Sequence, residues 1–343
     1  MHAAFIERRA ALRRLARLAA GTVTGRLAAG AAAGLPAAGA IAQTAFPSKP
    51  ITIVVPYTAG GPTDLTARRV AELLGRFIGA NVVVENRPGA ATLIAAESVA
   101  RAPKDGHTLL FAPGTTTSSN PYLFRKLPYR LEDFAPVSLV SRQPFVLTAS
   151  DQLNVKTVAQ LVDYARGRPA GINFGTTGVG SLTHIIGKWI GRTLQIEMQD
   201  VPYKGTSAAL GDLLGGRLDT QVEGIVSAIP LHRSGKARVL AVMGEERSPS
   251  LPDVPTFREA GYPELVASIW FGLLAPAGTP EDIVEKLRRA VADVVALPEY
   301  RDRLAEQGEV AVSSASRSQY AEHLQREYEA WGRIIRPLNL PPQ

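Results

Sequence analysis

The chain has 343 residues, a formal net charge of +7 and no cysteine. This length exceeds one typical domain of roughly 100 to 200 residues, so two compact units are expected. With 45% hydrophobic and 20% charged residues, the composition excludes a disordered or collagen-like chain. The absence of cysteine excludes disulfides, thiolate catalysis and cysteine-based zinc sites.

The first 42 residues differ in composition from the rest. The arginine-rich stretch IERRAALRRLARL precedes a segment of mostly Ala, Gly and Leu, and a small-x-small site follows at Ala40–Ala42. This order is typical of a secretory signal peptide over residues 1–42, so we expect cleavage after Ala42 and a mature protein in the periplasm. Arg26 and Pro36 interrupt the apolar segment, which argues against a membrane anchor. The pair Arg8–Arg9 leaves general and twin-arginine export both open.

This N-terminal segment also carries most of the charge. It holds six arginines and one glutamate, which are five of the seven net positive charges, so the remainder carries only about +2. No basic run follows residue 43, and we therefore expect no nucleic-acid partner. The histidines outside the segment lack metal-ligand spacing, so neither a metal nor a cofactor is expected. These histidines are His107, His184, His232 and His323.

Apolar strands alternate with amphipathic helices from residue 51 onward. Strands are predicted at 51–56, 81–85, 107–113 and, in part, 134–150, and a helix is predicted at 93–101. Another helix follows the glycine turn near residue 60, and its predicted apolar face consists of Leu65, Val70, Leu73, Leu74, Phe77 and Ile78. This alternation predicts an α/β fold with a largely parallel, doubly wound sheet.

The same alternation begins again near residue 144. Helices are predicted at 157–166, 181–191 and 206–216, and strands at 171–177, 195–203, 217–224 and 237–244. A second α/β unit is therefore expected. Near the C-terminus, Thr279 is the predicted N-cap of a helix whose first residue is Pro280, and a last helix is predicted at about 317–335.

Two glycine turns connect a strand to a helix, one in each half of the chain. The first is VPYTAGGPTDLTARR at 55–69, and the second is NFGTTGVGSLTH at 173–184. A helix start presents unpaired N–H groups and the positive end of the helix dipole, which together favour an anion. Neither turn matches a nucleotide-binding motif. Together, the two turns predict two anion-binding sites that face each other. The alternative is that their glycines only permit a sharp reversal of the chain.

Four side chains, most of them near these turns, each allow two interpretations. Ser181 and His184 have the Ser-x-x-His spacing of a nucleophile and base, but the surrounding residues lack the G-x-S-x-G turn. Ser181 is more simply an N-cap or a ligand donor. Asp64 either supports the first loop or contacts an ammonium group of an amino-acid ligand, and Glu223 raises the same question.

A series of motifs in one order resembles the periplasmic solute receptors of tripartite tricarboxylate transporters, often called Bug receptors. The resemblance runs from about residue 46 to the C-terminus. It rests on FPSKPITIVVPYTAGGPTDLTAR, VVVENRPGA, KDGHTLLFA, NPYLFRKLPY, VPYKGTSAALGDLLGGRLD, RSPSLPDVPTFREAGYP and WFGLLAPAGTP. It implies a two-domain fold like the type II periplasmic-binding proteins, with doubly wound sheets and a ligand cleft between the domains. Domain 1 is then expected at 43–143 plus 268–343, and domain 2 at 144–267.

The resemblance also implies a set of ligand-binding residues. On the first loop these are Tyr57, Gly60, Gly61, Thr63 and Asp64; on the second they are Gly178, Gly180, Ser181 and Thr183. Thr116 and Thr117, which follow another strand, are expected in the wall. Glu223 is expected there too, although relatives often carry Phe-Asp-Asn where this chain has Val222-Glu223-Gly224.

The function implied by the resemblance is that of an exported, non-enzymatic receptor. It would bind a small carboxylate or amino-acid-like ligand between its two domains and deliver it to the membrane components of a tripartite tricarboxylate-type transporter, acting as a monomer. Two alternatives from other classes are a periplasmic ligand sensor for a membrane kinase and a secreted hydrolase that uses Ser181.

Overall fold

The structure, a computed structural model, describes residues 46–341. The predicted signal peptide and its cleavage site lie outside the described residues. Every structural statement below concerns residues 46–341. Among them, no helix combines the length and the apolar character needed to cross a bilayer.

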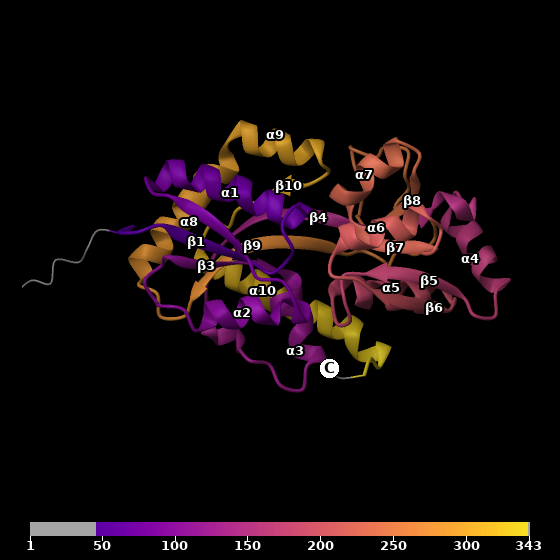
Figure 1. Ribbon diagram of the computed structural model, residues 1–343, viewed down its shortest axis with the longest axis horizontal. Helices are drawn as coiled ribbons and strands as arrows, with labels where there is room; N and C mark the ends of the chain where they lie inside the picture. Colours follow the sequence, from indigo (N-terminus) through magenta and orange to yellow (C-terminus); the bar gives the residue numbers. More distant parts are fainter. Residues whose placement is uncertain (1–45, 342–343) are drawn as a thin grey trace, which may run out of the picture. The chain divides into compact units, whose positions relative to one another are not determined.

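The first of two sheets, sheet A, is parallel on one side and antiparallel on the other (Figure 1). β1 pairs in parallel with β2 and β3, whereas β9 runs antiparallel to both β3 and β4. Its strands are β1 (Ile51–Val55), β2 (Val82–Asn86), β3 (Thr108–Pro113), β9 (Ser268–Pro276), the first part of β4 (Phe134–Ser150) and the short β10 (Val310–Ala311). We call the part of the chain built on this sheet lobe A.

Successive side chains of β1 point to opposite faces of sheet A, and different helices cover each face. Ile51, Ile53 and Val55 pack in one core with α1 and α8, while Val54 packs in another with α2 and α10. These helices are α1 (Pro62–Ile78), α2 (Leu93–Ala100), α8 (Glu281–Ala296) and α10 (Arg317–Ile335), and α9 (Pro298–Glu306) follows α8.

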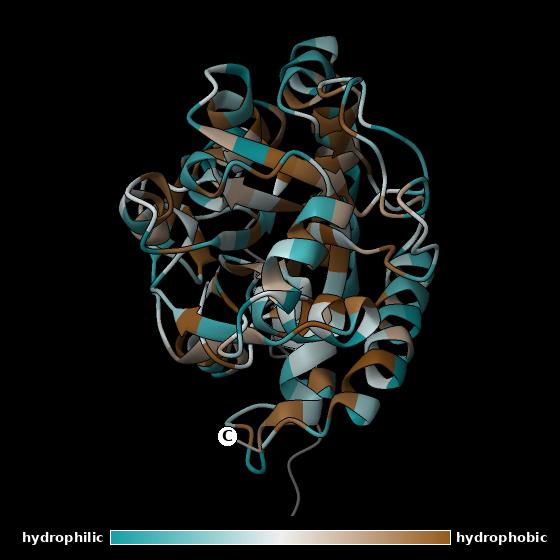
Figure 2. Ribbon diagram, turned by 90° about the vertical axis from the view of Figure 1, so that its right-hand side faces the viewer, coloured by the Kyte–Doolittle hydropathy of each residue, from teal (hydrophilic) through white to brown (hydrophobic). Residues whose placement is uncertain are grey.

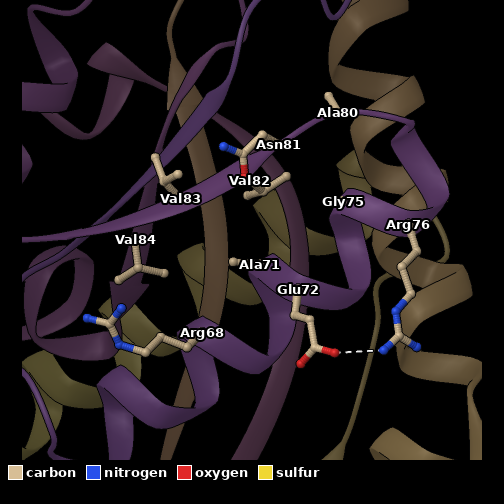
Figure 3. A pocket seen from close by; sticks show the side chains of 10 residues that line it. All are labelled: Arg68, Ala71, Glu72, Gly75, Arg76, Ala80, Asn81, Val82, Val83 and Val84. Atoms are coloured by element: carbon tan, nitrogen blue, oxygen red, sulfur yellow. Dashed lines mark hydrogen bonds and ion pairs between the residues drawn. The ribbon is translucent and has the colours of Figure 1, made fainter.

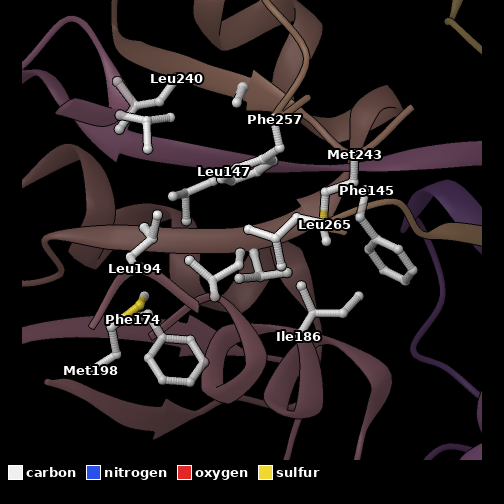
Figure 4. Close-up of a cluster of buried hydrophobic side chains, with 14 of the residues drawn as sticks. Phe145, Leu147, Phe174, Ile186, Leu194, Met198, Leu240, Met243, Phe257 and Leu265 are labelled. Atoms are coloured by element: carbon white, nitrogen blue, oxygen red, sulfur yellow. The ribbon is translucent and has the colours of Figure 1, made fainter. Parts of the chain in front are cut away.

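The second sheet, sheet B, supports lobe B. β5 pairs in parallel with β6 and β7, and the second part of β4 runs antiparallel to β7 and β8. The strands are β5 (Ile172–Thr176), β6 (Met198–Pro202), β7 (Thr220–Gly224) and β8 (Ala237–Val242); the helices are α4 (Val158–Arg166), α5 (Leu182–Leu194), α6 (Thr206–Leu214) and α7 (Ile225–Arg233). Figure 4 shows part of the lobe B core, in which Phe145, Phe174 and Met198 lie.

One strand belongs to both sheets. β4 pairs with β9 as far as Pro144 and with β7 from Phe145 onward. The chain returns to lobe A near Ala267, whose N–H donates to the Met243 carbonyl at 2.9 Å immediately before β9. The division into domains at 144 and 267 remains a proposal, and this change of pairing partner supports it.

α10 is a further connection between the lobes. Tyr320 near its beginning packs in a core of lobe A, whereas Trp331 and Ile335 near its end pack in the lobe B core. Figure 2 shows apolar residues on the strands and on the inward-facing parts of the helices. The two-domain α/β architecture expected from the sequence is therefore present, but its sheets are mixed and not largely parallel.

Two details of the helices differ from the sequence expectations. Leu65 is 56% exposed and Phe77 is 45% exposed. Leu65 precedes Val70 by five residues, about 500° of helical rotation, which places it on the opposite face. The helix after Thr279 begins at Glu281 with Pro280 as N-cap, because the Thr279 hydroxyl instead donates to the Pro276 carbonyl at 2.7 Å.

Candidate functional site

Both lobes contribute to a cavity of about 140 Å³. Lobe A supplies the first glycine turn, Thr115 and Ile269, and lobe B supplies the second turn and the beginnings of α6 and α7. The lining residues are Tyr57, Thr58, Gly61, Pro62, Thr63, Thr115, Phe145, Thr177, Leu182, Thr183, Lys204, Gly205, Thr206, Ser207, Ala208, Gly224 and Ile269. A methyl group at Gly205 of lobe B would lie 3.7 Å from the Thr58 hydroxyl of lobe A, so the lobes approach closely here.

Four helices begin at this cavity. The N-caps of α1, α6 and α7 line it, namely Gly61, Gly205 and Gly224, and so do the first residues of α5, Leu182 and Thr183. The amides in the first turn of each helix have no intrahelical acceptor, and each helix start carries a partial positive charge. Among the described residues, Lys204 is the one charged side chain in the lining, and none of them places a carboxylate there. The cavity therefore favours an anion.

Asp64 fixes the first turn and is not part of the lining. One of its carboxylate oxygens accepts the Gly60 N–H and the Arg68 Nε–H, both at 2.9 Å, and the other accepts the Asn86 Nδ2–H at 2.8 Å. Asn86 also donates to the Tyr57 carbonyl at 3.0 Å, so β2 holds both ends of the turn. Burial opposes ionisation, but the bonds from Arg68, Gly60 and Asn86 outweigh it and lower the pKa of Asp64. The carboxylate thus supports the loop, the first of the two roles considered above.

The second turn is held by a network of hydroxyl groups. The Thr183 hydroxyl accepts the Thr177 N–H at 2.8 Å and lies 2.9 Å from the Ser181 hydroxyl. Ser181 caps α5 by accepting the His184 N–H at 3.3 Å. Gly178 and Gly180 have φ angles of 119° and 80°, a region that favours glycine. Of the predicted residues on this turn, Thr183 lines the cavity, whereas Gly178, Gly180 and Ser181 do not.

His184 is bonded in a way that does not suit it as a base for Ser181. Its Nδ1 accepts the Gly180 N–H at 3.3 Å, and its Nε2 lies 3.7 Å from Asp200, which is paired with Lys188 at 2.8 Å. Desolvation by burial lowers the pKa of His184. The Ser181 hydroxyl bonds the His184 backbone and not its imidazole. The pair is a helix-capping arrangement.

The predicted wall residues lie in different places. Tyr57 lines the cavity, and desolvation raises its pKa to about 12, which a hydrogen bond with Thr115 partly offsets. Thr115 is in the lining, whereas the buried Thr116 hydroxyl lies 2.9 Å from that of Thr92, and neither Thr116 nor Thr117 lines the cavity. Gly60 and Glu223 line an adjacent cavity of about 300 Å³.

The loop before α6 also contributes to the cavity, although none of its residues is among the predicted ligand-binding residues. Lys204, Thr206 and Ser207 line the cavity, and the loop is braced by a 2.6 Å hydrogen bond from the Tyr203 hydroxyl to Asp212. The sequence VPYKGTSAALGDLLGGRLD contains a pattern that could have indicated this loop, because Gly205 and Thr206 follow a predicted strand and begin a helix. This is the same strand–glycine–helix pattern as in the two turns.

A larger hollow of about 810 Å³ lies away from this site (Figure 3). It is between α1 and the edge strand β2, and an exposed ion pair joins Arg76 and Glu72 along α1 at 2.6 Å. None of the residues predicted to bind ligand lines it. Its charges are paired and no helix starts there, so the smaller cavity between the lobes is the candidate site.

Comparison with known proteins agrees with this geometry. The family model of the tripartite tricarboxylate transporter family receptors matches residues 66–340. Protein BugT of Bordetella pertussis is 34% identical over 305 residues, covering 86% of this chain and 91% of that protein. The UPF0065 protein in the tcbD-tcbE intergenic region of Pseudomonas sp. strain P51 is 34% identical over 293 residues, covering 85% and 87%.

Solved structures are similar over most of the chain. MatC from Rhodopseudomonas palustris with bound malate is 35% identical, with a TM-score of 0.80 over 84% of this chain and 100% of that one. A second R. palustris protein, solved with adipate, is 33% identical, with a TM-score of 0.83 over 87% and 100%. The periplasmic binding protein BugD has a TM-score of 0.82 and 31% identity over 87% and 100%. The resemblance and fold class expected from the sequence are confirmed, and the chain belongs to the tripartite tricarboxylate transporter receptor family, whose members are periplasmic solute-binding receptors and not enzymes.

Proposed function

We propose that this protein is an exported receptor that binds a small carboxylate in the cavity between its lobes and delivers it to the membrane components of a tripartite tricarboxylate-type transporter. The observation that carries the proposal is the meeting of four helix N-termini around a cavity without an acidic side chain. The malate- and adipate-bound relatives support the carboxylate class.

Backbone N–H groups would provide most of the hydrogen bonds to the carboxylate. A carboxylate at the cavity accepts hydrogen bonds from first-turn amides and from the hydroxyls of Thr63 and Thr183, and Lys204 adds a positive charge at the exposed side. Each hydrogen bond to a charged group contributes about 1.5 to 3 kcal/mol. Four or five of them are enough for roughly micromolar affinity after ordering costs.

Calorimetry on the purified mature protein tests the proposal. A panel of mono- and dicarboxylates is titrated into the wild type and into Thr63→Val and Thr183→Val, which remove cavity hydroxyls with little change of volume. Thr193→Val, near the other end of α5 and outside the cavity lining, is the matched control. We expect at least one carboxylate to bind, about tenfold weaker binding by each cavity variant, and unchanged binding by the control. If no carboxylate binds the wild type, the proposal is wrong.

Delivery to membrane components needs its own test. The ligand-loaded protein is added to vesicles that contain the candidate transporter components, and uptake of the labelled carboxylate is measured. We expect uptake that depends on the receptor and is lost with Thr183→Val. Binding without receptor-dependent uptake would favour a sensory role.

A further inference from the structure

A second cavity lies directly beside the first. It has a volume of about 300 Å³, and Pro62, Thr206 and Ser207 line both cavities. The remaining residues come from the first turn, α1, α6, β7, α7 and the segment after α9. They are Gly60, Leu65, Leu210, Gln221, Glu223, Val226, Ser227, Leu231 and Gln307. The two cavities are therefore adjacent, and a ligand that spanned both would place one group in each.

Two buried acceptor side chains line this second cavity. Gln221 and Glu223 are two residues apart on β7, so both side chains lie on the same face of the sheet. Their exposed fractions are 2% and 1%. Glu223 accepts hydrogen bonds from the Thr148 hydroxyl at 2.7 Å and from Gln221 Nε2 at 3.3 Å. The Gln221 Oε1 has no hydrogen-bond partner among the described residues.

The electrostatics of the second cavity are opposite to those of the first. Its lining contains one carboxyl group and no lysine, arginine or histidine. Within residues 46–341, no ion pair includes Glu223, so no protein cation offsets its charge. Desolvation by burial raises the pKa of Glu223 to about 7, and the hydrogen bond from Thr148 opposes this rise. A buried carboxylate without a cation is costly, and a cationic ligand group removes that cost.

We propose that the second cavity is a subsite for an ammonium group, so that the preferred ligand of this protein is an aminocarboxylate. The proposal rests on the proposed carboxylate binding at the first cavity. The ammonium donates to the Glu223 carboxylate and to the unpaired Gln221 Oε1, while the carboxylate lies at the helix N-termini. Leu65, Leu210 and Leu231 provide apolar contacts for the carbon chain.

The same arrangement disfavours a second carboxylate in this place. A dicarboxylate would bring its distal oxygens against Gln221 Oε1, which is an acceptor, and against Glu223, which repels them whenever it is ionised. Like charges in a low-dielectric cavity repel, and the orphan amide oxygen would stay unsatisfied. This chain would therefore differ in preference from relatives solved with malate or adipate.

Calorimetry with matched ligand series tests the subsite. The intact mature protein is titrated with α-amino acids, with ω-amino acids from β-alanine to 6-aminohexanoate, and with the dicarboxylates and plain monocarboxylates of the same lengths. We expect the best aminocarboxylate to bind at least tenfold more tightly than the dicarboxylate of equal length. Glu223→Gln should reduce this preference at least tenfold and leave the plain monocarboxylates within threefold of wild type.

Three further variants separate a loss of ligand preference from a loss of folding. Gln221→Met keeps the volume and removes the acceptor, and it should reduce the preference for the ammonium group in the same direction. Glu197→Gln and Gln199→Met, exposed on or next to β6, are the matched controls and should change nothing. Thermal melting confirms that each variant is folded.

The outcomes separate the subsite from the proposed function. If dicarboxylates bind more tightly than aminocarboxylates, or if Glu223→Gln leaves the preference unchanged, the subsite is refuted while carboxylate binding stands. If no member of any series binds, both proposals are refuted together.

Discussion

Asp64 shows how a single charged residue serves an anion site without touching the anion. It is 2% exposed, and its oxygens are occupied by Gly60, Arg68 and Asn86. The Gly60 N–H is consequently used within the loop, and the amides at the beginning of α1 remain for a ligand. An acid next to an anion site is compatible with binding because it is neutralised by these donors.

Asp64→Asn should weaken the fold in a pH-dependent way. The folded pKa of Asp64 lies below its ordinary value of 3.8, so its stabilising effect is present above that value and is lost as pH falls through the folded pKa. We expect the substitution to lower the free energy of unfolding by about 1–3 kcal/mol at pH 7 and by less at pH 2. Urea unfolding at both pH values measures this. Asp163→Asn, exposed on α4, is the control; an equal loss at both pH values would contradict the account.

Glu309 is a buried acid with the opposite behaviour. It is 3% exposed, and its Oε1 accepts from the Thr66 hydroxyl at 3.4 Å while its Oε2 has no partner among the described residues. Desolvation raises its pKa to about 7, although the neighbouring hydroxyl groups of Ser141 and Thr66 act against the rise. The folded pKa lies above the unfolded one. Its contribution to stability is therefore complete below about pH 4.5 and declines as pH rises to about 7.

Glu309→Gln should remove this decline. Between pH 5 and pH 8 the wild type should lose up to roughly 3 kcal/mol more stability than the variant, because the variant has no charge to bury. Melting temperatures or urea midpoints across this range provide the comparison. Parallel pH profiles for the two proteins would show that Glu309 ionises freely in the folded state.

At the scale of elements, two glycines of lobe B have different roles. Gly178 has φ 119° in the second turn, whereas Gly211 lies within α6, where an added methyl group would have nothing within 4 Å. A side chain at residue 178 would be strained by the positive φ, whereas a methyl group at residue 211 would contact no neighbouring atom. The turn depends on glycine, and the helix does not.

Gly178→Ala should therefore destabilise the protein by about 1–2 kcal/mol, and Gly211→Ala should stabilise it by about 0.5–1 kcal/mol. Chemical denaturation of both variants gives the two values, each acting as the other's control. A neutral Gly178→Ala would mean that the turn relaxes to a negative φ without cost.

Most elements could be predicted from the sequence because each has its own local pattern. The last helix spans the predicted 317–335, and β4 spans the predicted 134–150. Local patterns do not reveal which side of a segment faces another lobe. Thr115 lines the cavity in place of the neighbouring Thr116, and the burial of Gln221 and Glu309 depends on packing between distant segments. The part of the site made by single turns was thus predictable, while the part made by contacts across lobes was not.

At the scale of the whole described chain, three segments connect the lobes: β4 at Pro144–Phe145, the return into β9, and α10. Both lobes contribute to the cavity, so a ligand makes its full set of contacts only when the lobes are close. Ligand binding then favours the closed arrangement in proportion to those contacts.

Distance measurements should show this closure. The chain has no cysteine, so labels attach only where cysteines are introduced. With labels at Asp302→Cys on α9 and Lys156→Cys before α4, we expect the distance between the labels to change when a carboxylate that binds by calorimetry is added at saturation. Labels at Lys156→Cys and Glu197→Cys, both in lobe B, should report no change. An unchanged distance for the first pair at full occupancy would contradict ligand-driven closure.

The helix starts around the cavity offer main-chain groups, and every residue except proline carries an amide N–H. Substitutions in the walls can therefore alter which metabolite is preferred without dismantling its charge recognition. Changes in ligand preference should therefore have little effect on fold stability, because the side chains that select the ligand are separate from the backbone amides that hold its charged group.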